Sequence, residues 1–330
     1  MVQGSLLRVK LHPVFMEKER LFRRPESEGT INIFHQVFTG LTSSELAEYH
    51  LAGYSAQDFL WMPRNPGRDE KPDLQHKTGF CNWKKSLSQL GIPLPDIMRV
   101  LAGVMLVGNM QYDKPGDHCV TKLAALLGVT QASLVGGLWR RTQAVRGDLV
   151  TREVGRREWE VGRRGLASSL YLRTVNKIIK RINRQHMTDC DQVKDSTSFI
   201  GILDMFGWQS SLHGSTCSME QLVMNTCSEH MQELYNTSVG IDTVPTMVCD
   251  VLLCVDRVTH SNGDSKELLT CLATTDAMIV QPGLDHSFTI HHYMGPVTYD
   301  SSNFIGKLAI RTIKKLSLFQ ILTETQCLLT

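Results

Sequence analysis

A carboxylate, a glycine and a carboxamide follow one another closely near the middle of the chain. Asp204, Gly207 and Gln209 belong to the stretch FIGILDMFGWQ and come directly after the apolar residues 199–203. A carboxylate at the carboxyl end of a buried strand lies where open α/β sheets bind ligands, and it can hold Mg²⁺ directly or through water. A glycine three residues later lets its backbone N–H approach a phosphate, because it has no Cβ. The spacing therefore suits a nucleoside triphosphate site in which Gln209 orients the attacking water.

The same spacing also has a purely structural explanation. An Asp and a Gly occur at many strand-to-turn junctions, because the Asp side chain caps the turn and the Gly accepts a positive φ. Taken alone, the D-x-x-G pattern favours this structural explanation. The neighbouring elements are therefore needed to choose between a turn and a binding site.

The flanking elements predict a helix-rich α/β fold. The unbroken apolar run 199–203 predicts a strand that is covered on both faces. A long helix with one apolar and one basic face is expected before it, from Leu166 to about Gln185. A second long helix is expected after it, because Ser218 and Gln221 form a capping-box pattern. Helix, central strand, glycine loop and helix together indicate a piece of an α/β core.

Three further elements are predicted from pattern alone. A nearly all-apolar helix over residues 97–109 should be deeply buried. A hairpin is expected around Gly147-Asp148, because residues that favour extended structure flank this pair. The segment FTIHHYMGPVTYD predicts two short strands around Gly295-Pro296, followed by a final helix.

Charge is distributed unevenly along the chain, although the formal net charge is only +2. Residues 138–184 hold 13 Lys or Arg against 4 Asp or Glu, whereas residues 185–300 hold 3 against 15. A basic block of this kind often meets a charged polymer. The nine cysteines form no Cys-x-x-Cys pair and the chain opens with no signal-like apolar run, so we expect a cytoplasmic protein with reduced thiols. No apolar stretch reaches the roughly 20 residues that a bilayer requires, so we expect no membrane insertion.

Several segments resemble, in chain order, those of the myosin motor domain. FIGILDMFGWQ resembles its switch II, D-x-x-G-F-E, and SMEQLVMNTCSEHMQELYN resembles its relay helix. Four other segments also resemble the family, namely EKERLFRRPESEGTINIFHQVFTGL, RVLAGVMLVGNMQY, GLASSLYLRTVNKIIKRIN and FTIHHYMGPVTYD. The resemblance covers roughly residues 4–310 and looks most like divergent unconventional myosins of the Dachs type.

The resemblance implies a partial P-loop NTPase-like motor domain with upper and lower 50K-type subdomains. Residues 1–330 would form this single partial domain. The upper subdomain would occupy residues 4–185, the switch II strand, relay helix and lower subdomain residues 186–310, and a C-terminal helix or tail residues 311–330.

The resemblance also implies Mg-ATP as cofactor, with Asp204 and Gly207 at the nucleotide and Asp204 holding Mg²⁺ through water. Gln209 then occupies a degenerate catalytic position, because the family has Glu there and a neutral amide cannot form a charge-assisted pair with an Arg. The sequence contains neither a G-x-x-x-x-G-K-[ST] P-loop nor a switch I motif, and it lacks the family's converter and lever arm. We therefore expect this chain to bind no Mg-ATP, and its status as an enzyme stays open because the family is an actin-activated ATPase. We also expect residues 199–203 to present an exposed edge, because their partner strands would lie upstream.

F-actin is the partner that the resemblance implies. The basic stretch 138–165 corresponds to a surface loop of the family's actin-binding cleft, and actin's surface is acidic. The candidate actin-binding residues are Arg140, Arg141, Arg146, Arg152, Arg156, Arg157, Arg163 and Arg164. A solvated charged loop without a partner explains this cluster equally well. The lower contact loop has His260-Ser261-Asn262 where the family has F-P-K, which weakens that second contact.

Other functions are less well supported. His291 and His292 are adjacent, so in a strand they point to opposite faces and do not form a metal site with His286. The basic block has few stacking aromatic residues, so we expect no nucleic acid partner. We predict a non-catalytic, actin-associated or scaffolding protein of the cytoskeleton or cell cortex, with protein scaffold partners. The alternative is a truncated piece of an ATP-driven, actin-based motor.

Overall fold

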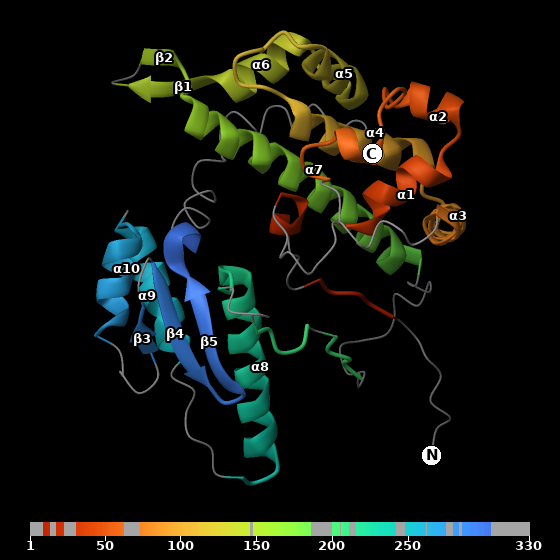
Figure 1. The fold of residues 1–330 in the computed structure, drawn as a ribbon. Helices are drawn as coiled ribbons and strands as arrows, with labels where there is room; N and C mark the ends of the chain where they lie inside the picture. The colour runs from red at the N-terminus through yellow and green to blue at the C-terminus, as the bar shows by residue number, and fades with distance from the viewer. Residues whose placement is uncertain are drawn as a thin grey trace, which may run out of the picture. The chain divides into compact units, whose positions relative to one another are not determined.

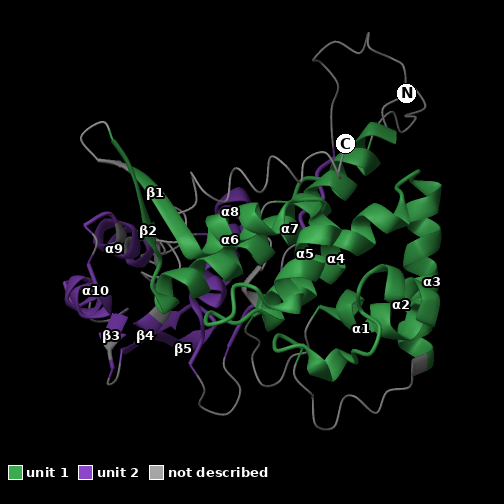
Figure 2. Cartoon of the chain, turned by 90° about the horizontal axis from the view of Figure 1, so that it is seen from above, with its two compact units in different colours: residues 1–197, 314–330 green, residues 198–313 purple. Residues whose placement is uncertain are grey.

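The computed structural model describes residues 9–13, 18–22, 31–62, 73–145, 148–185, 200–204, 206–210, 216–241, 248–261, 263–274, 280–283 and 286–304. The chain divides into two compact units, which Figure 2 colours green and purple. Unit 1 comprises residues 1–197 with 314–330, and unit 2 comprises residues 198–313. Each unit has its own apolar core.

Unit 1 is helical apart from one hairpin (Figure 1). Its described elements are the 3-10 helix η1 (Lys18–Leu21), α1 (Asn32–Gly40), α2 (Ser43–Glu48), η2 (Ala56–Asp58), α3 (Asp73–Gln89), α4 (Leu94–Asn109), α5 (His118–Leu127), α6 (Gln131–Trp139), β1 (Arg140–Val145), β2 (Asp148–Glu153) and α7 (Arg156–Gln185). Helix α4 is at the centre, because eleven of its sixteen residues are buried and it packs against both α5 and α7. The predicted deep burial of this helix is confirmed.

Helices α5 and α6 follow α4 and are short. Gly128 ends α5 with a left-handed backbone (φ 67°), which a glycine accepts without strain. The Thr130 side chain accepts a hydrogen bond from Ser133 N and so caps α6. Among the described residues no single helix is long and apolar enough to cross a bilayer, and α5 and α6 reach that length only together, with a bend of 111° between them.

Helix α7 begins at Arg156, ten residues earlier than the predicted start at Leu166. Its buried positions Trp159, Arg163, Leu166 and Leu170 follow a spacing of four, three and four, which is one continuous face of a helix. The charged residues between them conceal this periodicity in the sequence. The basic block is therefore mostly the first turns of a packed helix.

The predicted hairpin around Gly147-Asp148 is confirmed. Strands β1 and β2 pair antiparallel, with a register that runs from Arg140 opposite Glu153 to Val145 opposite Asp148. All six residues of β2 are exposed, so the hairpin projects from unit 1 without covering any of its core.

Unit 2 combines a small sheet with three helices (Figure 1). Its described elements are α8 (Met219–Ser238), α9 (Val248–His260), α10 (Ser265–Leu272), β3 (Val280–Pro282), β4 (Ser287–His292), β5 (Gly295–Asp300) and the 3-10 helix η3 (Ser301–Asn303). The three strands are antiparallel in the order β3-β4-β5. The two predicted strands are present, but their turn lies at residues 293–294 and not at Gly295-Pro296.

The capping of α8 and the facing of the histidine pair agree with prediction. Ser218 N donates to Gln221 Oε1 at 2.7 Å, as the capping-box pattern requires. His291 is exposed and His292 is buried, so the two side chains lie on opposite faces of β4. The predicted C-terminal helix or tail at residues 311–330 lies outside the described residues.

The predicted buried strand at 199–203 is wrong for the residues that the structure describes, 200–203. These residues form neither strand nor helix, and Ile200 and Ile202 are 94% and 90% exposed. A strand needs a neighbour to satisfy its N–H and C=O groups, and no described strand lies beside this run.

Candidate functional site

Asp204 and Gly207 lie in an open part of unit 2. The Asp204 side chain is exposed and makes no hydrogen bond or ion pair with any described residue. A Cβ added to Gly207 would meet no atom within 4 Å, and Gly207 is not among the glycines with positive φ. Neither a phosphate cradle nor a strained turn therefore explains this glycine in the present conformation.

Gln209 is held firmly on helix α8. Asn225 accepts a hydrogen bond from Gln209 N at 2.8 Å and donates one to Gln209 O at 2.7 Å. The Gln209 side chain folds back on its own segment, because its Nε2 donates to Gly207 O at 3.1 Å. The predicted water-positioning amide is thus engaged within the loop.

The Asn225 contact belongs to a buried polar chain that crosses unit 2. Asn225 Nδ2 also donates to Tyr299 Oη at 2.7 Å, and Tyr299 Oη lies 2.7 Å from His292 Nε2. The amide can only donate to the phenol oxygen, so the phenol proton is free to bond another acceptor, and His292 Nε2 lies within hydrogen-bond distance. Burial raises the pKa of the Tyr299 phenol far above its ordinary value, which keeps this proton in place.

This chain of buried polar side chains ends at Glu229, which is 2% exposed. His292 Nδ1 lies 3.0 Å from Glu229 Oε1, and Tyr293 N donates to the same oxygen at 3.0 Å. Within the described residues, Glu229 Oε2 and His292 Nδ1 have no well-aligned hydrogen bond. Trp208 covers the outer side of the chain, with its ring edge-on to His292 and Tyr293 at centroid distances of 4.9 and 5.6 Å.

Sequence reasoning missed the residues of this polar chain. The spacing of Val223, Cys227, His230 and Leu234 suggests an apolar stripe on α8, but the last three residues are exposed. The buried face instead carries Asn225 and Glu229, which are four residues apart and share one face. The signal was present as two polar residues in register with Leu222, but an apolar residue is the usual occupant of such a position.

The predicted actin-binding arginines are mostly paired with carboxylates of unit 1. The pairs are Arg141 and Arg152 with Glu158, Arg156 with Asp113, and Arg163 and Arg164 with Glu160. Arg140 and Arg157 are exposed and have no hydrogen bond or ion pair with the part of the chain that the structure describes, and Arg146 lies outside it. The structure thus brings most of these cations together around α7, where their charges are partly neutralised.

Arg163 has to be removed from the predicted actin-binding set, because it is only 4% exposed. Its guanidinium donates to the carbonyl oxygens of Gly108 and Met110 at 2.8 and 3.1 Å, at the end of α4. The same group lies 5.0 Å from the ring centroids of both Trp61 and Trp159. The last carbonyls of a helix have no partners within it, so Arg163 caps α4 and cannot contact another protein.

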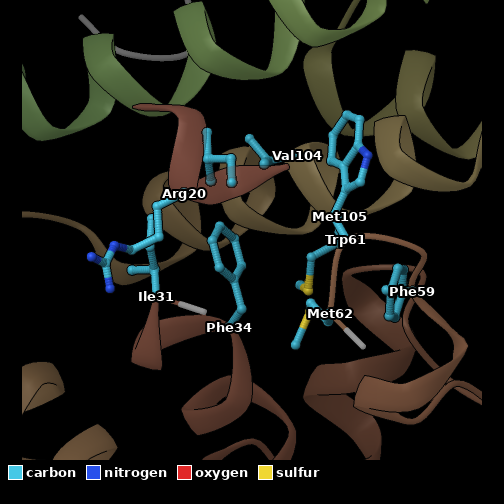
Figure 3. Close-up of a pocket in the computed structure, with 9 residues that line it drawn as sticks. Arg20, Ile31, Phe34, Phe59, Trp61, Met62, Val104 and Met105 are labelled. Atoms are coloured by element: carbon cyan, nitrogen blue, oxygen red, sulfur yellow. The ribbon is translucent and has the colours of Figure 1, made fainter. Parts of the chain in front are cut away.

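Unit 1 has two other features that bear on ligand chemistry, an apolar pocket and a cluster of possible metal ligands. Figure 3 shows an apolar pocket at the side chains of Phe34, Trp61 and Met105, with a cavity of about 20 Å³. That volume admits about one water molecule and no nucleotide. Asp117, His118 and Cys119 offer ligand atoms within 4.8 Å of one another, but they form the start of α5. The positive end of the helix dipole disfavours a cation there, and Asp117 and His118 already pair with each other.

Comparisons with known proteins agree with the resemblance seen in the sequence. A family model described as the myosin head (motor domain) matches residues 2–242. Human unconventional myosin-XIX is 27% identical over 88% of this chain and 34% of its own length. The non-muscle myosin heavy chain of Drosophila melanogaster is 27% identical over 72% of this chain and 12% of its own length. The myosin-J heavy chain of Dictyostelium discoideum is 24% identical over 92% of this chain and 15% of its own length. The chain spans about a third or less of the length of these relatives.

Proposed function

Because the chain belongs to the myosin motor-domain family, we propose that it is an actin-associated cytoskeletal protein whose own 330 residues do not hydrolyse ATP. The conformation of residues 204–209 carries this proposal. Asp204 has no described partner, and Gln209 is held on Asn225 with its side chain turned onto Gly207 O. This arrangement supports the proposal that the segment does not perform triphosphate chemistry.

Triphosphate chemistry needs more groups than this segment supplies. A cradle of backbone amides, a Lys on the phosphates and a hydroxyl on Mg²⁺ act together in P-loop enzymes. The 330 residues contain no G-x-x-x-x-G-K-[ST] motif that would provide these groups. We therefore propose that this chain by itself carries neither Mg-ATP nor Mg²⁺.

The contact with actin is proposed for the β1–β2 hairpin and the start of α7. All six residues of β2 are exposed, and Leu149 and Val150 are 79% and 50% exposed. Arg140, which lies opposite Glu153 in the register, and exposed Arg157 add positive charge at its base. An apolar contact flanked by positive charge suits an acidic protein filament. The positive charge speeds association, and the apolar residues stabilise the complex.

The proposed location is the cytoplasm, at the cytoskeleton or cell cortex, where scaffold partners would also bind. The second candidate function is that these residues are part of an ATP-driven, actin-based motor. It is supported by the relatives, which are myosins of about three times this length or more. In that case residues outside this chain would complete the nucleotide site.

Nucleotide binding and actin binding are tested separately on the 330-residue chain. In equilibrium titrations with a fluorescent ATP analogue and Mg²⁺ we expect no saturable binding. Micromolar, Mg²⁺-dependent binding that the substitution Asp204→Asn abolishes would overturn the non-catalytic assignment. In cosedimentation with F-actin we expect pelleting at low salt that weakens as salt is added. Absence of pelleting at low salt would overturn the actin assignment.

A further inference from the structure

The hairpin contains a repulsive pair one position from its base. In the register of β1 and β2, Arg141 lies directly opposite Arg152, and both side chains are on the same face of the hairpin. Like charges directly opposite each other destabilise a strand pair. Another group has to compensate for this repulsion if the hairpin is to stay paired.

Glu158 is that group. Its carboxylate accepts hydrogen bonds from Arg141 Nη1 at 2.6 Å and from Arg152 Nη2 at 2.9 Å, and so joins the two strands to the first turn of α7. Partial burial pushes the pKa of the Glu158 carboxyl up, but the hydrogen bonds and charges of the two arginines outweigh it and hold the pKa below its ordinary value. An acidic residue is also favourable in the first turn of a helix.

The other supports of the hairpin are at its base or on its opposite face. Val154 N donates to Trp139 O at 3.0 Å, and Tyr112 Oη donates to Val154 O at 2.9 Å, which fixes only the base. The hydroxyls of Thr142 and Thr151 form a hydrogen bond, with 2.9 Å between their Oγ1 atoms, on the face away from Arg141. A two-stranded hairpin without a covered face is marginal in water, so Glu158 provides the main link that orients it.

We propose that Glu158 is a positioning residue, which holds the hairpin in the orientation that an acidic protein filament binds. Glu158 draws the Arg141 face toward α7, which leaves the opposite face for the partner. Alternation along the strands places Leu149 beside the Thr142–Thr151 pair on that outer face. The partner surface that fits it has an apolar spot and hydrogen-bonding groups, next to carboxylates that meet Arg140. This inference rests on the proposed actin association.

The substitution Glu158→Gln separates positioning from simple charge steering. It removes one negative charge beside the hairpin and so makes the net charge there more positive, and steering alone therefore predicts tighter binding to F-actin. Positioning predicts weaker binding, because Arg141 and Arg152 then repel each other and the hairpin becomes less ordered. Ordering the hairpin again on binding costs free energy. We expect the F-actin dissociation constant to rise about three- to tenfold, and amide hydrogen exchange across residues 140–153 to speed up by a similar factor.

Two further variants complete the test. Asp113→Asn makes the same change in net charge at the Arg156 pair, away from the strands, and should leave hydrogen exchange of the hairpin unchanged. Glu158→Gln combined with Arg152→Gln removes the repulsion and restores the original net charge, so it should recover the protection and most of the affinity. The proposal is overturned if Glu158→Gln binds F-actin as tightly as Asp113→Asn, or if the double variant recovers neither property.

The exchange measurement does not depend on actin. If the unaltered chain fails to bind F-actin while Glu158→Gln still loosens the hairpin, the actin assignment fails and the role of Glu158 in orienting the hairpin stands. If the unaltered chain binds and Glu158→Gln changes neither exchange nor affinity, the actin assignment stands and the role of Glu158 fails.

Discussion

The arginine-rich residues 140–164 and the stretch 200–210 are both marked by the sequence as candidates for function, but they are organised in opposite ways. In the first, most charged side chains find charged partners within unit 1, and one cation, Arg163, is buried. In the second, the carboxylate of Asp204 has no described partner, while uncharged Asn225 holds the backbone of Gln209. A charge in the sequence therefore does not say whether it is available for a ligand; its partners in the folded unit decide that.

The two units also satisfy their buried polar groups differently. In unit 1, Arg163 reaches helix-end carbonyls that would otherwise lack partners, so the cation completes the packing. In unit 2, Asn225 and Tyr299 are well bonded, but Glu229 keeps one oxygen without a described partner. Substitution of Arg163 in unit 1 should therefore lower the free energy of unfolding more than substitution of Asn225 or Tyr299 in unit 2.

Removal of the buried cation should have the largest effect. We expect Arg163→Met to lower the free energy of unfolding of unit 1 by about 3–5 kcal/mol, because the α4 carbonyls lose their partner and Glu160 loses one of its two arginines. Chemical denaturation followed by tryptophan fluorescence measures this change. Arg164→Met, which breaks a half-exposed pair with the same Glu160, should cost no more than about 1 kcal/mol. Equal losses in both variants would contradict the capping role of Arg163.

Loss of the Asn225 amide should have the next largest effect. We expect Asn225→Leu to destabilise unit 2 by about 2 kcal/mol, because three hydrogen bonds are lost and Gln209 is released from α8. Amide exchange at Gln209 should also speed up. Cys227→Ser, an exposed change on the same helix, serves as the control and should alter neither quantity. Unchanged exchange at Gln209 in Asn225→Leu would show that the loop is held by other contacts.

The Tyr299 phenol should make the stability of unit 2 depend on pH in the alkaline range. Its pKa is raised in the folded state, so the native state keeps a proton that the unfolded state loses above pH of about 10. Stability is thus fully present below that pH and falls as pH rises further. Tyr299→Phe should cost about 1–2 kcal/mol at neutral pH, and its stability should fall less steeply between about pH 10 and 12. If the free energy of unfolding falls equally steeply with pH in the unaltered protein and in Tyr299→Phe, Tyr299 is not the cause of the alkaline loss of stability.

Gly207 should show the smallest effect. We expect Gly207→Ala to change stability by less than about 0.5 kcal/mol, because a Cβ meets open space and φ is not positive. Gly128→Ala places a Cβ on a left-handed residue and should cost about 1 kcal/mol, which makes it the matched comparison. A large loss in Gly207→Ala would mean that this glycine is in close contact with another group in solution.

Much of the local structure could be predicted from the sequence. The apolar positions of α4, the Gly147-Asp148 turn, the Ser218 cap and the opposite facing of His291 and His292 all depend on residues within a few positions of one another. The order of the motifs was also enough to recognise the family that the match over residues 2–242 supports.

Contacts between distant residues decided the rest. Arg163 is buried because Gly108, 55 residues earlier, leaves a carbonyl without a partner, and Asn225 is buried because Tyr299 lies 74 residues later. Residues 200–203 are as apolar as a core strand but remain unpaired, because hydrogen bonds and a covering face come only from other strands. By itself the sequence determined the buried positions of α4, the β1–β2 turn and the cap of α8, since short-range spacing and backbone preference specify these. Only the tertiary structure decided which polar groups are desolvated and paired, since that depends on what the fold places beside them.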